Sequence, residues 1–288
     1  MKNLLCIAAA LACGGSALAG APINGADFAA KYGSPLWSQT IGTQFGNNTD
    51  ASIDFANGSE IDALYASVSG GFLHIGVAGN LETNFNKLNI VLDYASGGQN
   101  TLSGLANLGN LDGLTMDSGF EADAVLSFTS GNDPIEWYVD GSLADGTGGF
   151  LGGGAAAGPL MVQLGGADIS FAQDNSNVGG VANLGEPNTS DPATVTTGIE
   201  IVIDLAAMGW DGSSDILLAG WVNGSGNDFL SNQVIGGLAD GTGNLGAPSG
   251  IDFNQFDGEQ FVRLTIPTPG TVGLVGLAGF AAVRRRRA

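Results

Sequence analysis

The sequence predicts an all-β protein built as a single antiparallel β-sandwich. Short apolar, β-branched runs recur between clusters of Gly, Asn and Asp, as they do in strands separated by turns. Glycine makes up 49 of the 288 residues, well above the usual level of about 7%, and is typical here of turns between many strands. No amphipathic helical stretch of normal length occurs between the two chain ends, and a hydrophobic content of 44% is enough to form a core.

The predicted strands follow the chain in order, each bounded by turn-forming residues. They are 64–68, 72–78, 88–94, 124–128, 135–139, 160–164, 167–172, 198–205, 216–222, 229–235 and 260–266. The one short helical segment expected in the domain is 205–209, which follows a strand and ends at a glycine. Such a series of strands is typical of an antiparallel sandwich.

The first 19 residues have the layout of a secretory signal peptide. Lys2 supplies a positive start, 4–12 form a short apolar segment, and small residues Ala17 and Ala19 precede the expected cleavage. This predicts export through the Sec translocon and cleavage by signal peptidase, with a mature chain that begins at Gly20.

Both cysteines, Cys6 and Cys13, lie in the segment expected to be removed. The mature domain would then hold no disulfide, no cysteine-bound metal and no thiol nucleophile. Lipidation at Cys13, which follows Ala-Leu-Ala, is the alternative to cleavage before Gly20.

The last 22 residues form a second signal. Pro267, Thr268, Pro269 and Gly270 precede an apolar run, 271–283, and Arg284, Arg285, Arg286 and Arg287 follow it. As a helix the 14 residues from 270 to 283 would measure about 21 Å, whereas a bilayer core needs about 20 residues. The arginines mark a cytoplasmic stop. This short C-terminal apolar helix serves either as a removable sorting signal or as a permanent single-pass anchor.

The order of Pro-x-Pro, short apolar helix and terminal arginines resembles the PEP-CTERM sorting signal of exported bacterial proteins. Thr268 stands where that family usually has Glu. The resemblance implies that an exosortase-like enzyme removes the tail. Together, the two terminal signals divide the chain into three parts: a signal peptide at 1–19, a β-sandwich domain at 20–266 and a sorting or anchor signal at 267–288.

The charge of the expected mature domain is strongly negative. All 28 acidic residues lie between Gly20 and Pro267, together with three basic ones, which gives −25 there against −20 for the whole chain. A phosphate backbone would be repelled, so nucleic acid is excluded as a partner. The surface instead attracts cations, calcium above all, or serves solubility.

Two passages resemble the DOMON-like and family-9-like carbohydrate-binding sandwiches. One is the opening hairpin, Gly-Ser-Glu-Ile-Asp-Ala-Leu-Tyr-Ala at 58–66 with Gly-Phe-Leu-His-Ile-Gly-Val at 71–77. The other is the strand and short turn at 197–209. The resemblance implies a jelly-roll-like sandwich, whose members bind sugars, haem or other ligands, or serve as structural modules.

Trp137 and Tyr138 are the candidate sugar-binding residues. They are neighbours on the predicted strand 135–139 and face opposite ways, so one of them is expected at the surface, where an aromatic ring can stack on a sugar. Burial is the commoner fate of a large aromatic side chain.

The hexapeptide Leu-Ala-Asp-Gly-Thr-Gly occurs twice, with Asp145 and Asp240 at its third position. Asp-Gly is a favoured turn pair, so a turn is the first interpretation. Calcium, which takes its ligands from carboxylates and turn carbonyls, is the alternative.

Other chemistry-bearing residues show no catalytic pattern. His74 is the only histidine, so neither a zinc site nor a Ser-His-Asp triad can be assembled. Glu200 and Asp204 share one face of a predicted strand, as in a half-solvated strand.

The sequence therefore predicts an exported, non-enzymatic cell-surface or matrix protein with polysaccharide as its expected ligand. A secreted glycan-active hydrolase, which would need two close carboxyls in a cleft, is one alternative. A purely structural surface module is the other.

Overall fold

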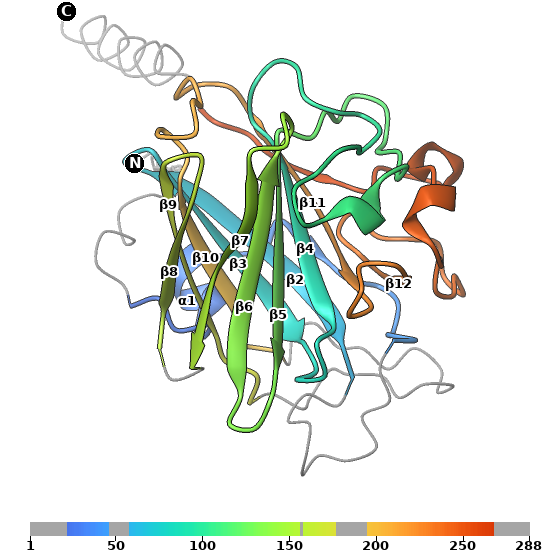
Figure 1. Cartoon of the computed structure of the whole chain (residues 1–288), viewed down its shortest axis with the longest axis horizontal. Helices are drawn as coiled ribbons and strands as arrows, with labels where there is room; N and C mark the ends of the chain where they lie inside the picture. Colours follow the sequence, from blue (N-terminus) through green and yellow to red (C-terminus); the bar gives the residue numbers. More distant parts are fainter. Residues whose placement is uncertain (1–21, 46–57, 156–157, 177–194, 268–288) are drawn as a thin grey trace, which may run out of the picture.

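The computed structural model describes residues 22–45, 58–155, 158–176 and 195–267. Two antiparallel sheets stack on each other, which confirms the predicted all-β sandwich (Figure 1). The first sheet has the order β1 (Trp37–Ser38), β2 (Glu60–Ser69), β3 (Phe72–Asn80), β10 (Gly198–Asp204), β9 (Ala167–Gln173) and β8 (Leu160–Leu164). The second has the order β12 (Leu230–Val234), β11 (Ile216–Asn223), β4 (Lys87–Asp93), β5 (Ala124–Gly131), β6 (Glu136–Leu143) and β7 (Gly148–Ala155), with β13 (Val262–Leu264) paired to β11.

Each of the eleven predicted runs overlaps a strand, and the structure adds three elements. These are strand β1, strand β7 and helix α1 (Phe28–Tyr32). Short 3₁₀ turns also occur at Gly109–Leu111, Pro248–Gly250 and Phe253–Gln255. The expected helical segment 205–209 is a hydrogen-bonded turn rather than a helix, closed by Trp210 N–H, which donates to the Leu205 carbonyl over 3.1 Å.

The main core lies between the sheets and follows strand alternation. Leu73, Ile75 and Val77 of β3 point inward, and Ile201 and Ile203 of β10 join them. Because every second residue points inward, His74 and the other alternate positions face the opposite side of the sheet, as the sequence predicts.

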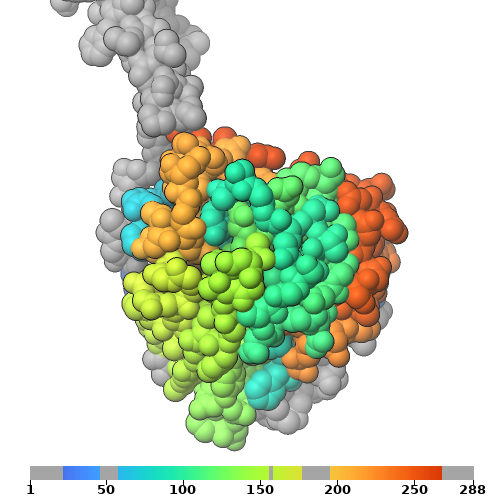
Figure 2. Space-filling view, turned by 45° about the horizontal axis from the view of Figure 1, so that its top comes forward, coloured from blue at the N-terminus to red at the C-terminus, as the bar shows by residue number. Residues whose placement is uncertain are grey.

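A second core covers part of the outer face of the second sheet. The long connection between β4 and β5 packs there against the chain between β12 and β13, and Trp221 of β11 meets Phe253 at a ring distance of 5.9 Å. The two covering segments lie side by side on the surface, teal to green and orange to red in Figure 2. Every residue of β5 is buried, whereas β6 alternates between buried and half-buried residues and every residue of β7 is half-buried or exposed.

Helix α1 covers the outer face of the first sheet. Phe28 is buried against β3 where Gly76 leaves room, since a β-carbon at Gly76 would lie 2.9 Å from the Phe28 ring. Tyr65 of β2 and Tyr32 complete this small cluster.

Candidate functional site: an aromatic platform on the second sheet

Three neighbouring aromatic side chains lie in series beside the second sheet. Phe85 precedes β4, Tyr138 lies on β6 and Phe150 on β7. The ring centroids of Phe85 and Tyr138 are 6.3 Å apart, and those of Tyr138 and Phe150 are 6.5 Å apart. Phe85 is 40% exposed and Phe150 60% exposed. We call these three residues the aromatic platform; it extends from the loop before β4, beside Gly131 at the end of β5, across Tyr138 of β6 to Phe150 near the start of β7.

Strand alternation and register fix two of the three rings. Tyr138 points outward because its neighbours Trp137 and Val139 belong to the inter-sheet core. Phe150 pairs with Asp140, the next outward position of β6, beyond a bulge that follows Val139.

The backbone itself places Phe85. Its φ is +71°, a left-handed conformation that is unusual for a bulky residue. Its N–H donates to the carbonyl of Ser130 over 2.8 Å, which ties the residue to the end of β5. Strain of this kind persists only where surrounding structure holds it, and it is concentrated at functional sites.

Two glycines let the rings lie against the sheet. A β-carbon at Gly131 of β5 would lie 2.3 Å from Cζ of Phe85, and one at Gly153 of β7 would lie 2.9 Å from Cδ1 of Tyr138. Real β-carbons do not approach other atoms so closely. Both positions therefore require glycine as long as the rings keep these places.

Polar groups occupy one side of the platform. The Tyr138 hydroxyl donates to Oε2 of Glu136 over 2.5 Å, and Nδ2 of Asn132 donates to the same oxygen over 2.8 Å. These bonds from Tyr138 and Asn132 lower the pKa of Glu136, and the carboxylate in turn raises the pKa of Tyr138. At neutral pH this edge therefore presents a carboxylate beside a protonated phenol.

The other side carries a lysine and a second acid. Lys87 lies in the same cross-strand row as Tyr138, with Thr129 between them. Burial lowers the pKa of Lys87, and the nearby Asp140 works in the opposite direction. Asp140 also accepts a hydrogen bond from Nδ2 of Asn107 over 2.9 Å.

The combination suits a ligand with alternating apolar and polar surfaces. Ring faces stack on apolar C–H surfaces, while the flanking carboxylates, amides and lysine offer hydrogen bonds at the edges. A sugar ring has both kinds of surface. The open shape favours a chain that lies along the surface over a small molecule that must be enclosed.

Trp137, the second residue expected to stack on sugar, is placed differently. It is 5% exposed and packs edge-on against Phe171 at a ring distance of 6.0 Å, so it belongs to the core. Of the two candidates, Trp137 is therefore the one that the alternation of β6 turns inward, which rules it out as a surface stacking residue, and Tyr138 is the one turned outward. The sequence interpretation missed Phe85 and Phe150; glycines inside the strands at 131 and 153 were the signal available.

Asp145 and Asp240 both lie in exposed turns. Oδ1 of Asp145 accepts from Thr147 N–H over 2.8 Å in the connection between β6 and β7. Asp240 lies in a turn in which Thr242 N–H donates to the Ala239 carbonyl over 3.1 Å. Among the residues that the structure describes, no three His, Cys, Asp or Glu side chains cluster in a way that could hold a metal ion.

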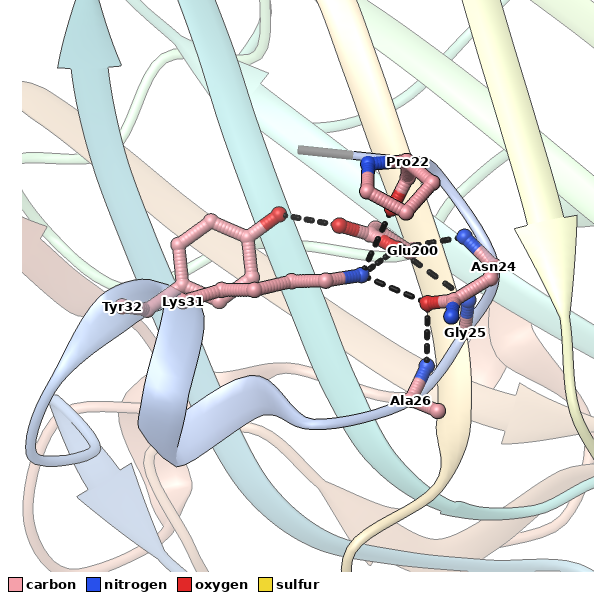
Figure 3. A network of polar contacts seen from close by, with 7 residues as sticks. All are labelled: Pro22, Asn24, Gly25, Ala26, Lys31, Tyr32 and Glu200. Carbon is pink, nitrogen blue, oxygen red and sulfur yellow. Dashed lines mark hydrogen bonds and ion pairs between the residues drawn. The ribbon is translucent and has the colours of Figure 1, made fainter. Parts of the chain in front are cut away.

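Glu200 is buried rather than half-solvated, which corrects the sequence expectation. It is 2% exposed. One carboxylate oxygen accepts from Nζ of Lys31 over 2.7 Å and from the backbone N–H of Asn24 over 2.8 Å, and the other accepts from the Tyr32 hydroxyl over 2.7 Å (Figure 3). Residues 22–32 fold over this part of β10 and exclude the water that strand alternation alone would allow.

His74 and Asp204, also on this outer face, show no catalytic geometry. Burial lowers the pKa of His74, and the charge of Glu200 opposes that effect. Asp204 accepts a hydrogen bond from Ala207 N–H over 3.0 Å and so stabilises the turn after β10.

A groove of about 810 Å³ lies between the end of β2 and the segment that follows β13. Trp210, Tyr32 and Ile266 are among its walls, and Pro267 lines its rim. Asp211 is the only carboxylate among the described residues that line it. Hydrogen bonds from Ser214 and Ser213 lower the pKa of Asp211 to about 2. The groove therefore lacks the facing pair of acids that glycoside hydrolysis usually needs.

The export and sorting residues Ala17, Ala19, Gly20, 268–270 and 284–287 lie outside the described residues. Within the described ranges, no helix has the length and apolar character needed to cross a bilayer. Comparison of the chain with models of protein families, with curated proteins and with solved structures finds no match.

Proposed function

We propose that the protein is an exported, non-enzymatic component of the cell surface or extracellular matrix that binds polysaccharide through the aromatic platform. The series of three partly exposed rings at Phe85, Tyr138 and Phe150 carries this proposal. Exposed aromatic rings lose apolar contact with water when a sugar face covers them, and their flat shape fits that face.

The layout of the platform favours an extended glycan over a single sugar. The three rings, with neighbouring centroids 6.3 and 6.5 Å apart, offer more than one stacking surface, so neighbouring sugars can each be bound weakly. Several weak contacts along one chain add up because the second and third are made intramolecularly. Hydrogen-bonding groups on both sides of the rings, such as Asn132 and Lys87, serve the hydroxyls at the sugar edges.

The proposed route to the surface rests on the two chain ends. Residues 1–19 direct the chain to the Sec translocon and are removed by signal peptidase. The segment 267–288 then holds the chain at the inner membrane until an exosortase-like enzyme removes it, or keeps it there as an anchor. The strong negative charge of the domain, −25 between Gly20 and Pro267, suits a protein that must stay soluble outside the cell.

A glycan array distinguishes the proposal from its two alternatives when two quantities are measured. One is the binding of the protein to each glycan, and the other is the release of label from the glycans, which reports hydrolysis. The matched pair of variants is Phe85→Ala and Phe72→Ala. Both phenylalanines are 40% exposed, but Phe72 lies on β3 of the first sheet, whereas Phe85 lies in the loop that leads into β4 of the second. We expect the wild type to bind at least one unbranched glycan without releasing label, Phe85→Ala to lose about tenfold or more in affinity, and Phe72→Ala to bind as the wild type does.

Three outcomes would overturn the proposal. Steady hydrolysis of the bound glycan would favour the glycan-active hydrolase. Absence of binding to every glycan would favour the purely structural module. Equal losses in Phe85→Ala and Phe72→Ala would show that binding, where it occurs, does not depend on the platform.

A further inference from the structure

More acidic than basic side chains lie around the platform, and this affects which kind of glycan it can bind. Its rings are flanked by two acids, Glu136 and Asp140, and by one lysine, Lys87. Glu136 is held as a carboxylate by its bonds from Tyr138 and Asn132. The groups around the rings therefore offer charged acceptors in excess of charged donors.

The other basic groups of the domain are engaged elsewhere. Lys31 is buried in its ion pair with Glu200 on the outer face of the first sheet. Arg263 lies on β13, with a guanidinium nitrogen 3.5 Å from the carboxylate of Asp215. A ligand that approaches the rings meets Lys87 as its nearest basic partner, and the negative charge of Asp140 acts on Lys87.

From this arrangement, and resting on the proposed function, we infer that the platform binds neutral or amine-bearing glycans and rejects polyanionic ones. Sugar hydroxyls donate to the carboxylates of Glu136 and Asp140, and the ammonium of an amino sugar does so with added charge attraction. A uronate or sulfate group near the rings would face two like charges and the field of a domain that carries −25.

Three β-1,4-linked polysaccharides test this inference: hydroxyethyl cellulose, which is neutral, carboxymethyl cellulose, which is anionic and has the same glucan backbone, and chitosan, a glucosamine polymer that carries amines. Affinity electrophoresis and microcalorimetry would measure the binding of the exported protein at low and high salt. We expect carboxymethyl cellulose to bind at least about fivefold more weakly than hydroxyethyl cellulose at low salt. The difference in affinity between the two polymers should become smaller at high salt, where the charges are screened.

Charge-neutral variants locate the effect. Glu136→Gln combined with Asp140→Asn should bind carboxymethyl cellulose more strongly relative to hydroxyethyl cellulose than the wild type does, whatever the two substitutions cost in binding to the neutral polymer. The control is Asp145→Asn combined with Asp240→Asn, which removes the same charge from two exposed turns. If the control gains as much as the platform variant, the rejection comes from the whole domain and the inference fails.

The remaining outcomes separate the inference from the function on which it rests. Equal binding of the anionic and neutral polymers at low salt would overturn the inference and leave the proposed function intact. Failure of all three polymers to bind the wild type would overturn the inference, and absence of binding to every glycan of the array would overturn the proposed function as well.

Discussion

A β-carbon on Gly131 would lie 2.3 Å from Cζ of Phe85, so the ring of Phe85 occupies the space that a side chain at 131 would take. The glycine sits at the end of β5, and the phenylalanine reaches it from the loop before β4. The ring of Phe85 can therefore take this position only because residue 131, in the neighbouring strand, has no side chain.

Gly131→Ala should displace the Phe85 ring. Gly131 does not have a positive φ, so the effect is steric rather than conformational. Overpacking of this kind costs about 1–3 kcal/mol, and we expect glycan affinity to fall together with the free energy of unfolding. Gly250→Ala is the control, because a β-carbon there meets nothing within 4 Å. Thermal melting and glycan binding of the two variants check the prediction; unchanged binding by Gly131→Ala would contradict it.

The buried pair of Lys31 and Glu200 should matter more for stability than the exposed pair of Arg263 and Asp215. The side chains of the first pair are 8% and 3% exposed, and those of the second 52% and 32%. Glu200→Gln leaves the Lys31 charge buried without its partner, which costs about 3–5 kcal/mol. Asp215→Asn should cost less than about 1 kcal/mol.

Urea unfolding of the two variants measures this difference. A double variant, Lys31→Met with Glu200→Met, should recover only part of the loss, because the backbone N–H groups of Asn24 and Gly25 also donate to Glu200. Similar losses in Glu200→Gln and Asp215→Asn would show that residues 22–32 do not depend on this ion pair.

Asp93 should make the domain lose stability as the pH rises. Burial above all, with help from Asp123 and Glu121, raises its pKa from 3.8 to about 6. Because the folded state holds this proton more tightly than the unfolded state, its contribution is complete below about pH 4 and is lost as the pH rises through 6.

Urea unfolding between pH 4 and 7 compares the wild type with Asp93→Asn, which keeps an acceptor for Glu121 N–H at 2.9 Å. After allowance for solvent screening at this half-buried group, the wild type should lose about 1 kcal/mol more than the variant over that range. Parallel pH profiles would show that Asp93 titrates normally in the folded protein.

Most of the fold follows from local sequence, because strand alternation and turn residues act over a few positions. Each of the eleven apolar runs predicted as strands overlaps an observed strand. Strand β7 was not predicted from the sequence, because Gly148–Ala155 is glycine-rich and lies at a sheet edge, where few side chains need to be apolar. Helix α1 was not predicted either, because its five residues are too few to show a helical period.

The site was harder to predict because its contacts cross the chain. Alternation says that Trp137 and Tyr138 face opposite ways, but only the packing of β6 on Phe171 decides which one is buried. The burial of Glu200 depends on Lys31, which is 169 positions away in the sequence. Glycines inside strands carry part of the missing information, since each marks a place where something else lies against the backbone.

The final prediction concerns the segment 267–288. If the tail is a sorting signal, the arginines at 284–287 hold the chain at the membrane until a processing enzyme cuts near Pro267. Replacing all four with Gln should let the chain pass through and appear uncut outside the cell. Arg263→Gln is the control, because it removes an arginine of the domain at β13 and should leave processing unchanged.

Mass spectrometry of the surface and secreted fractions should find wild-type chains that begin at Gly20 and end in the region of Pro267. A cell without the exosortase-like enzyme should accumulate the longer form in its membrane fraction. Wild-type chains that keep the tail in the membrane of normal cells would favour the permanent anchor. Intact wild-type chains that end at Ala288 outside the cell would overturn both, because a tail that neither anchors nor is removed cannot direct the protein to its place.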